Sequence, residues 1–202
     1  MDSVFTIAAA VLLGYVLGSF SFAHLTARYI LHSEVADIGA GFAGASTMYR
    51  RAGVRAGAIT IIGDFSKSAV AVVLAQKFIA PNVGMWAGAA AVAGHNWPMF
   101  YGFKGGRGVA TAAGALLALV PLALAAALIL GALAFYFTRN ALITTAAVFV
   151  PVVPLAWALA YPAGAVAYTF ALPGVVTVYT WLSGRKHPLG ERWRKTSMRR
   201  HP

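Results

Sequence analysis

Cysteine is absent from the sequence, and acidic residues are scarce. The 202 residues include 5 Asp and Glu against 16 Lys and Arg, so the formal net charge is +11. The lack of cysteine excludes disulfide bonds, thiolate metal sites and a cysteine nucleophile. Charged residues make up 10% of the chain and hydrophobic residues 60%, whereas a soluble domain has about 25% and about 45–50%. This composition excludes an ordinary water-exposed surface and indicates a membrane protein.

Long apolar runs supply enough residues to cross a bilayer, which takes about 20. One of these runs, Val109–Phe137, has 29 residues, which are too many for one ordinary crossing. Pro121 lies near its middle. The run is therefore either one kinked helix, giving six spans, or two helices that meet near Pro121, giving seven. The other predicted spans are Val4 to about Thr26, Gly57–Lys77, Val83–Tyr101, Ala141–Tyr161 and Ala163–Leu182.

The positions of Lys and Arg distinguish the two counts, because cytoplasmic loops carry an excess of both. With seven spans and the N-terminus outside, 14 of the 16 lie inside. With six spans, 8 of those 14 move outside. We predict an all-α integral membrane protein with seven transmembrane helices, its N-terminus outside and its C-terminus cytoplasmic. The inside regions are Ala27–Ala56, Gly102–Gly108, the turn at Arg139 and the tail after Leu182.

This count predicts one polytopic membrane domain over 1–182 and a basic cytoplasmic tail over 183–202. The span Val109–Val120 then has only 12 residues. It must be tilted, re-entrant or shielded by protein, because lipid offers no partner to an unpaired backbone group.

Two glycine-containing loops fall on the predicted cytoplasmic side. In the first, Asp37–Arg51, residues Gly39–Gly44 match GxGxxG. No strand or βαβ unit surrounds the match, so we reject a dinucleotide site. Such glycines still bring backbone N–H groups close to an anion, although a flexible connection between spans is an equal alternative.

The second loop is more specific. Between Gly102 and Gly108, four glycines alternate with Lys104 and Arg107, and a predicted helix follows at once. Backbone donors, a helix N-terminus and two cations together favour a phosphate ligand. The G-K-[ST] ending of a P-loop is absent. The alternative is a basic turn that only sets topology.

Asp64 and Lys67 lie three residues apart on one face of a predicted span. Intramembrane charges are costly and face the interior of a bundle. We interpret them as a structural ion pair, with a catalytic role as the alternative.

At these positions the sequence resembles the bacterial acyl-phosphate:glycerol-3-phosphate acyltransferases. The likeness begins at Leu17-Gly18-Ser19 and continues through Gly39–Arg50 and Gly57–Ser68. It is closest over Gly94–Thr111, where the family pattern G-H-x-x-P-x-F-x-x-F-K-G-G-K-G-V-A-T corresponds to GHNWPMFYGFKGGRGVAT.

The resemblance implies a multi-pass enzyme of the bacterial cytoplasmic membrane. It implies transfer of a fatty acyl group from acyl phosphate to glycerol 3-phosphate, giving lysophosphatidic acid and phosphate, with no metal or other cofactor. The predicted catalytic residues are His95, Ser46, Thr47 and His187. The predicted ligands of substrate and phosphate are Arg50, Lys104, Gly105, Gly106, Arg107, Gly108, Thr111, Gly39, Gly41 and Gly44.

The sequence departs from the family in its first and third motifs. The Ser of G-S-G-N-x-G-A-T-N is Ala40, and its two Asn are Phe42 and Thr47. The third motif, H-x-x-N-I-x-R, is not recognisable, and His187 lies in roughly its place. Ser46, Thr47 or His187 would then replace the lost groups.

Three functions remain open: acyl transfer to glycerol 3-phosphate, acyl transfer to another acceptor, and non-catalytic binding of phosphorylated lipid. Phe42 would suit a less polar acceptor. The tail Arg185–Arg200 follows a span, which favours the anionic cytoplasmic leaflet over nucleic acid as its partner.

Overall fold

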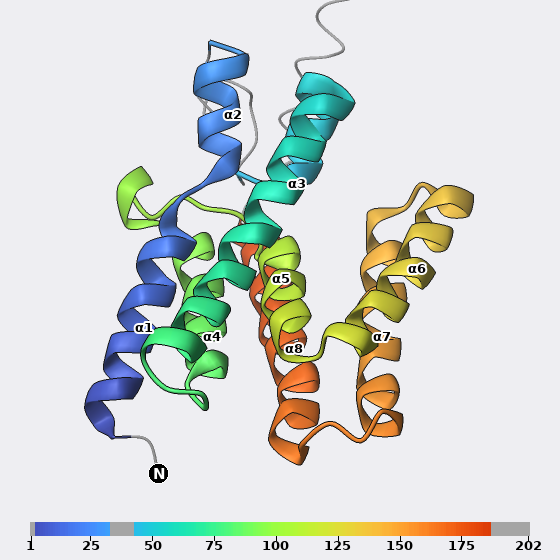
Figure 1. Ribbon diagram of the computed structural model, residues 1–202. Coiled ribbons are helices and arrows are strands. Elements are labelled where there is room, and N and C mark those ends of the chain that lie inside the picture. Colours follow the sequence, from blue (N-terminus) through green and yellow to red (C-terminus); the bar gives the residue numbers. More distant parts are fainter. Residues whose placement is uncertain (1–2, 33–42, 187–202) are drawn as a thin grey trace, which may run out of the picture.

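A computed structural model describes residues 3–32 and 43–186 of the chain (Figure 1). Over these residues the chain forms eight α-helices and one 3₁₀ helix, with no β-strand. The prediction of an all-helical protein is therefore confirmed. The elements are α1 (Val4–Ser19), α2 (Phe22–Ile30), α3 (Ala45–Phe78), α4 (Gly84–Asn96), η1 (Met99–Tyr101), α5 (Val109–Leu119), α6 (Pro121–Thr138), α7 (Ala141–Ala158) and α8 (Ala163–Lys186).

The helices are long and apolar enough for a multi-pass membrane protein. Within the described residues, five segments can cross a bilayer by length and composition: Val4–Ile30, α3, α6, α7 and the Ala163–Ser183 part of α8. Large apolar side chains on their outer faces are exposed, as lipid contact requires; Phe5 is 86% and Phe170 73% exposed. Helices α4 and α5 are shorter, so the count of seven crossings stays a prediction.

Two helix ends differ from the predicted spans. The first span is interrupted at Phe20, since the backbone there is extended and Ser21 caps α2 by accepting from the His24 N–H. The predicted span Val83–Tyr101 is α-helical only to Asn96, and its last three residues form the 3₁₀ helix η1. The residue before a proline is disfavoured in the α conformation, and Pro98 therefore ends the helix at Trp97.

The predicted cytoplasmic loop Ala27–Ala56 is partly helical, which corrects the sequence-based boundary. Helix α3 begins at Ala45, eleven residues before that loop was expected to end. Only Gly53 interrupts it, with a φ of 84° that a glycine adopts without strain. Arg50 is therefore held on a helix rather than on a loop.

The predicted break near Pro121 is confirmed. Helix α5 ends at Leu119, and Pro121 occupies the first turn of α6, where its missing N–H has no intrahelical partner to lose. The 11 residues of α5 span only about 17 Å, and its segment Thr111–Leu116 is buried against α3, α4 and α8. Of the three expected possibilities, tilting, re-entry or shielding, the structure shows shielding by protein.

Close helix approach depends on glycine. At Gly14 and Gly18 of α1, an added Cβ would collide with the backbone of Ala87 and Ala91 of α4. At Gly114 of α5 it would collide with the Phe65 carbonyl of α3. Small residues at crossings allow the packing that associates helices in lipid. In Figure 1 the α6–α7 hairpin leans away from this bundle, and α2 rises at the end opposite the N-terminus.

We predict that Gly18→Ala weakens the α1–α4 crossing. Overpacking against a backbone costs about 1–3 kcal/mol, so the thermal unfolding midpoint in detergent, followed by circular dichroism, should fall. Gly174→Ala in α8 is the matched control, because nothing lies within 4 Å of its added Cβ. Equal midpoints for the two variants would contradict this packing.

Candidate functional site

The glycine- and cation-rich loop, residues 102–108, folds back on the end of α4. The Gly106 N–H donates to the His95 carbonyl over 3.1 Å, and the Gly105 carbonyl accepts from the Ala43 N–H over 3.1 Å. These bonds join the loop to α4 and to the segment that precedes α3. The two loops that the sequence analysis singled out therefore meet in space.

The glycines of this loop are needed for its approach to α4. A Cβ at Gly105 would collide with the His95 carbonyl, and one at Gly106 with His95 Nε2. Gly108 has a φ of 81° and precedes the first turn of α5. Packing on His95 thus accounts for Gly105 and Gly106, and the positive φ accounts for Gly108. Their predicted contact with phosphate stays a prediction.

Three cations surround the meeting point of the loops. Lys104 and Arg107 of the loop and Arg50 of α3 are all exposed. Partial desolvation and then the positive charge of Arg50 lower the pKa of the Arg107 guanidinium. Two like charges so close are a favourable setting for an anion. In the described part of the chain Asp64 is the single acidic residue, and it is buried.

The remaining predicted residues occupy different environments. Gly44 precedes α3, Ser46 is exposed in its first turn, and Thr47 is buried there. Thr111 is fully buried, and its carbonyl accepts from the Ser68 Oγ over 2.6 Å. Gly39, Gly41 and His187 lie outside the described residues.

His95 is buried at the C-terminal end of α4 and contacts the intramembrane charges of α3. Lys67 Nζ lies 2.9 Å from Asp64 Oδ1, which confirms the interpretation as an ion pair. The same ammonium lies 3.0 Å from His95 Nδ1 and donates to the Phe20 carbonyl over 2.7 Å. Sequence reasoning missed the link from this pair to His95, although two charges inside one span were a signal that they face a polar partner.

Aromatic contacts fasten the Trp97–Tyr101 segment to the first two helices. Tyr101 stacks on His24, with ring centroids 4.3 Å apart, and Phe100 lies 5.0 Å from Phe20. The Tyr15 hydroxyl donates to the Trp97 carbonyl over 2.8 Å. The start of the loop is thereby fixed beside the α1–α2 break.

An apolar pocket of about 230 Å³ lies between α4 and α8, beside the loop. Its lining includes Ala89 and Asn96 of α4 and Tyr168, Ala171 and Val175 of α8. Among the described residues the buried Asn96 Oδ1 has no hydrogen-bond partner. The sequence analysis did not select Asn96, although it directly follows His95 in the closest family motif.

Known proteins share both the sequence pattern and this architecture. A profile of the family described as Glycerol-3-phosphate acyltransferase matches residues 8–187. The crystal structure of an integral membrane glycerol 3-phosphate acyltransferase, PlsY, in its glycerol 3-phosphate form, superimposes with a TM-score of 0.77 at 26% identity. That similarity covers 92% of this chain and 93% of the other.

Two curated relatives are similar over a shorter stretch. The glycerol-3-phosphate acyltransferase of Alkaliphilus metalliredigens is 38% identical over 122 residues, which is 60% of this chain and 63% of that protein. That of Pseudomonas syringae pv. tomato is 43% identical over 128 residues, or 63% and 67% of the two chains. The family profile matches most of the length of this chain, and the chain therefore belongs to the glycerol-3-phosphate acyltransferase family.

Proposed function

We propose that this protein transfers a fatty acyl group from acyl phosphate to glycerol 3-phosphate. The acceptor hydroxyl oxygen forms a bond to the carbonyl carbon, and the bond from that carbon to the phosphate oxygen breaks. The acceptor proton leaves with the phosphate, and the products are lysophosphatidic acid and inorganic phosphate. The observation that carries the proposal is the packing of the 102–108 loop, with its cations, onto His95.

Positioning is the main task for such an enzyme, because acyl phosphate is already activated. Arg50, Lys104 and Arg107 would bind the phosphate groups of the two substrates. The backbone of Gly105, Gly106 and Gly108 would add N–H donors, and so would Gly39, Gly41 and Gly44 of the first loop. Thr111 would also contact substrate. His95 would contact the reacting groups, assisted by Ser46, Thr47 and His187.

The pocket between α4 and α8 would accept the start of the acyl chain. Alanine, valine and leucine dominate its lining, and Asn96 marks the end nearest the loop. Its volume is below the roughly 300–1,000 Å³ that holds a whole drug-sized ligand. The rest of the chain would therefore extend into lipid, from which an acyl phosphate could enter sideways.

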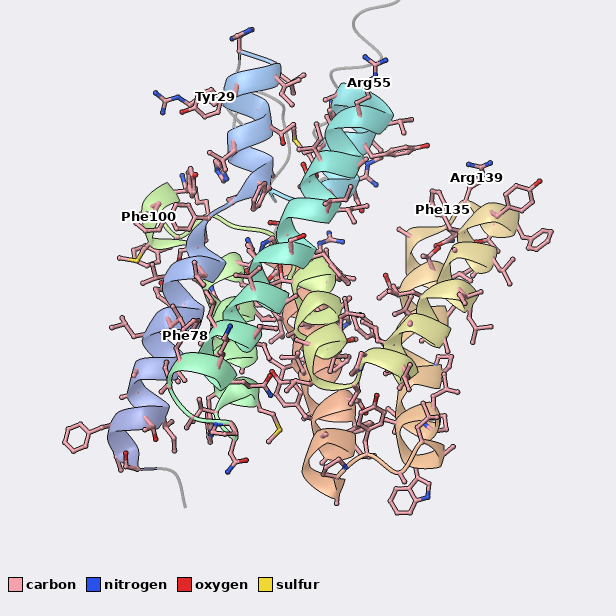
Figure 2. All side chains as sticks on the ribbon, viewed as in Figure 1. Tyr29, Arg55, Phe78, Phe100, Phe135 and Arg139 are labelled. Atoms are coloured by element: carbon pink, nitrogen blue, oxygen red, sulfur yellow. The ribbon has the colours of Figure 1, made fainter. Side chains whose placement is uncertain are left out.

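We also propose that the protein spans the bacterial cytoplasmic membrane seven times, with its N-terminus outside. Figure 2 supports this orientation, since Arg55 and Arg139 lie at the same end as Phe100, and Figure 1 has the N-terminus at the other. Cations at one end are typical of a cytoplasmic face. Residues 183–202 would then contact the anionic leaflet.

Use of another acceptor is the second candidate function, and the residues Ala40, Phe42 and Thr47 favour it. They occupy positions where the family pattern has Ser and Asn. Replacing polar side chains by Ala and Phe removes hydrogen bonds to a polar acceptor and creates a more apolar surface.

The decisive measurement is phosphate release from acyl phosphate by the purified protein in lipid. Under the first proposal, release requires glycerol 3-phosphate, and mass spectrometry detects lysophosphatidic acid. Release with a different alcohol alone would establish the second candidate. Saturable binding of acyl phosphate without release under any condition would refute both and identify a non-catalytic binder of phosphorylated lipid.

We predict that Lys104→Ala raises KM for a phosphorylated substrate by about 10- to 100-fold. A hydrogen bond to a charged group contributes about 1.5–3 kcal/mol, and each 1.4 kcal/mol is tenfold. Lys77→Ala, the same change at an exposed lysine in the last turn of α3, should leave the kinetics unchanged. Equal kinetics for the two variants would show that Lys104 does not bind substrate.

We also predict that Ala89→Leu shortens the preferred acyl chain. Ala89 lines the pocket two turns before Asn96, so a larger side chain there would obstruct a long chain but not a short one. The ratio of kcat/KM for sixteen-carbon over eight-carbon acyl phosphate should fall by about tenfold or more, the scale of a few methylene contacts. Ala167→Leu, on α8 but outside the pocket lining, is the control; an unchanged ratio in both would exclude this route.

A further inference from the structure

The hydrogen-bonding capacity of the Lys67 ammonium constrains the protonation of His95. An ammonium has three N–H donors and no acceptor. In the described part of the chain, three polar atoms lie within 3.0 Å of Lys67 Nζ. The ammonium donates to the Phe20 carbonyl at 2.7 Å, is hydrogen-bonded to His95 Nδ1 at 3.0 Å and forms an ion pair with Asp64 Oδ1 at 2.9 Å.

These partners come from three separate elements, which makes the arrangement rigid. Phe20 follows the last residue of α1, where the carbonyl has no helical partner to bond. Asp64 is on α3 with Lys67, and His95 is on α4. The side chains of Lys67, Asp64 and His95 are at most 5% exposed, so water does not replace these contacts at low cost.

Nδ1 of His95 must then be the nitrogen without a proton. An ammonium can only donate, so Nδ1 is the acceptor in its 3.0 Å contact with Lys67 Nζ; Asp64 Oδ1, the other charged group that faces Nδ1, is farther away at 3.4 Å. A neutral imidazole with a bare Nδ1 carries its hydrogen on Nε2, since hydrogen bonding at one nitrogen sets the state of the other.

Nε2 is the nitrogen that faces the glycine- and cation-rich loop. A Cβ at Gly106 would collide with His95 Nε2 and would lie 2.7 Å from the Ala43 carbonyl. The Nε2 atom therefore points to the place where the loop and the segment before α3 meet. A hydrogen on this atom would lie where the loop and this segment meet.

We propose that Lys67 is a positioning residue that holds His95 as the Nε2–H tautomer, so that His95 donates a hydrogen bond to a substrate oxygen and does not act as a base there. Only the identity of that oxygen rests on the proposed function: it belongs to the phosphate or the carbonyl of acyl phosphate. A fixed donor stabilises charge that develops in the transition state. Asp64 compensates the charge of the buried ammonium and keeps it in place.

Nitrogen NMR of the full-length protein, with ¹⁵N-labelled histidine in lipid, tests the tautomer directly. Imidazole ¹⁵N shifts distinguish a protonated from a bare nitrogen, and the His95→Gln variant identifies which signals to read. We expect a bare Nδ1 and a protonated Nε2. The opposite assignment in the wild-type protein would overturn the proposal without any variant.

Lys67→Met supplies the matching perturbation. Loss of the ammonium leaves the Asp64 carboxylate, whose Oδ1 lies 3.4 Å from His95 Nδ1, as the charged group nearest to that nitrogen. A carboxylate only accepts hydrogen bonds. The proton should move to Nδ1, and kcat should fall by about 10²–10³-fold, the effect of removing one donor of this kind, with little change in KM. Lys77→Met, on the same helix, should keep the wild-type tautomer and kinetics.

The wild-type spectrum covers the case in which Lys67→Met does not fold, because it tests the tautomer without any variant. An Nε2–H tautomer in a protein that releases no phosphate would leave this inference intact and refute the proposed function. Turnover with an Nδ1–H tautomer would do the reverse.

Discussion

A buried ammonium needs hydrogen-bond partners and a compensating charge, and the described structure around the site depends on this requirement at Lys67. Its hydrogen-bond partners come from the junction of α1 and α2 and from α4, and its counter-ion from α3. The interruption at Phe20 is therefore part of the site, because an unbroken helix would keep that carbonyl for itself. One side chain in this way relates three helices and orients His95.

The glycine crossings make that arrangement possible. Gly14 and Gly18 bring α1 against α4, so that the carbonyl of Phe20 and the ring of His95 reach the same ammonium. The loop after α4 continues the pattern, since Gly106 allows its backbone to approach the ring. Small residues thus allow both the close packing of α1 on α4 and the approach of the loop backbone to His95.

Much of this could be predicted from residue patterns, but only where the cause was local. Pro121 separates two helices because its ring fixes φ and removes the backbone N–H. The loop around Lys104 is recognisable from its glycines and charges. The end of α4 at Asn96 was missed because hydropathy continues through the aromatic residues that follow. Arg50 was placed on a loop because the charges around it obscured an early start of α3.

Composition and motifs by themselves determined an all-helical membrane protein, the break at Pro121 and the family to which the chain belongs. They also located the Asp64–Lys67 pair, because a spacing of three residues is a local property of a helix. Only the tertiary structure decided that this pair contacts His95 and the Phe20 carbonyl. Those partners are 28 and 47 residues from Lys67 along the chain, and hydrogen bonds across such separations depend on how closely the helices pack.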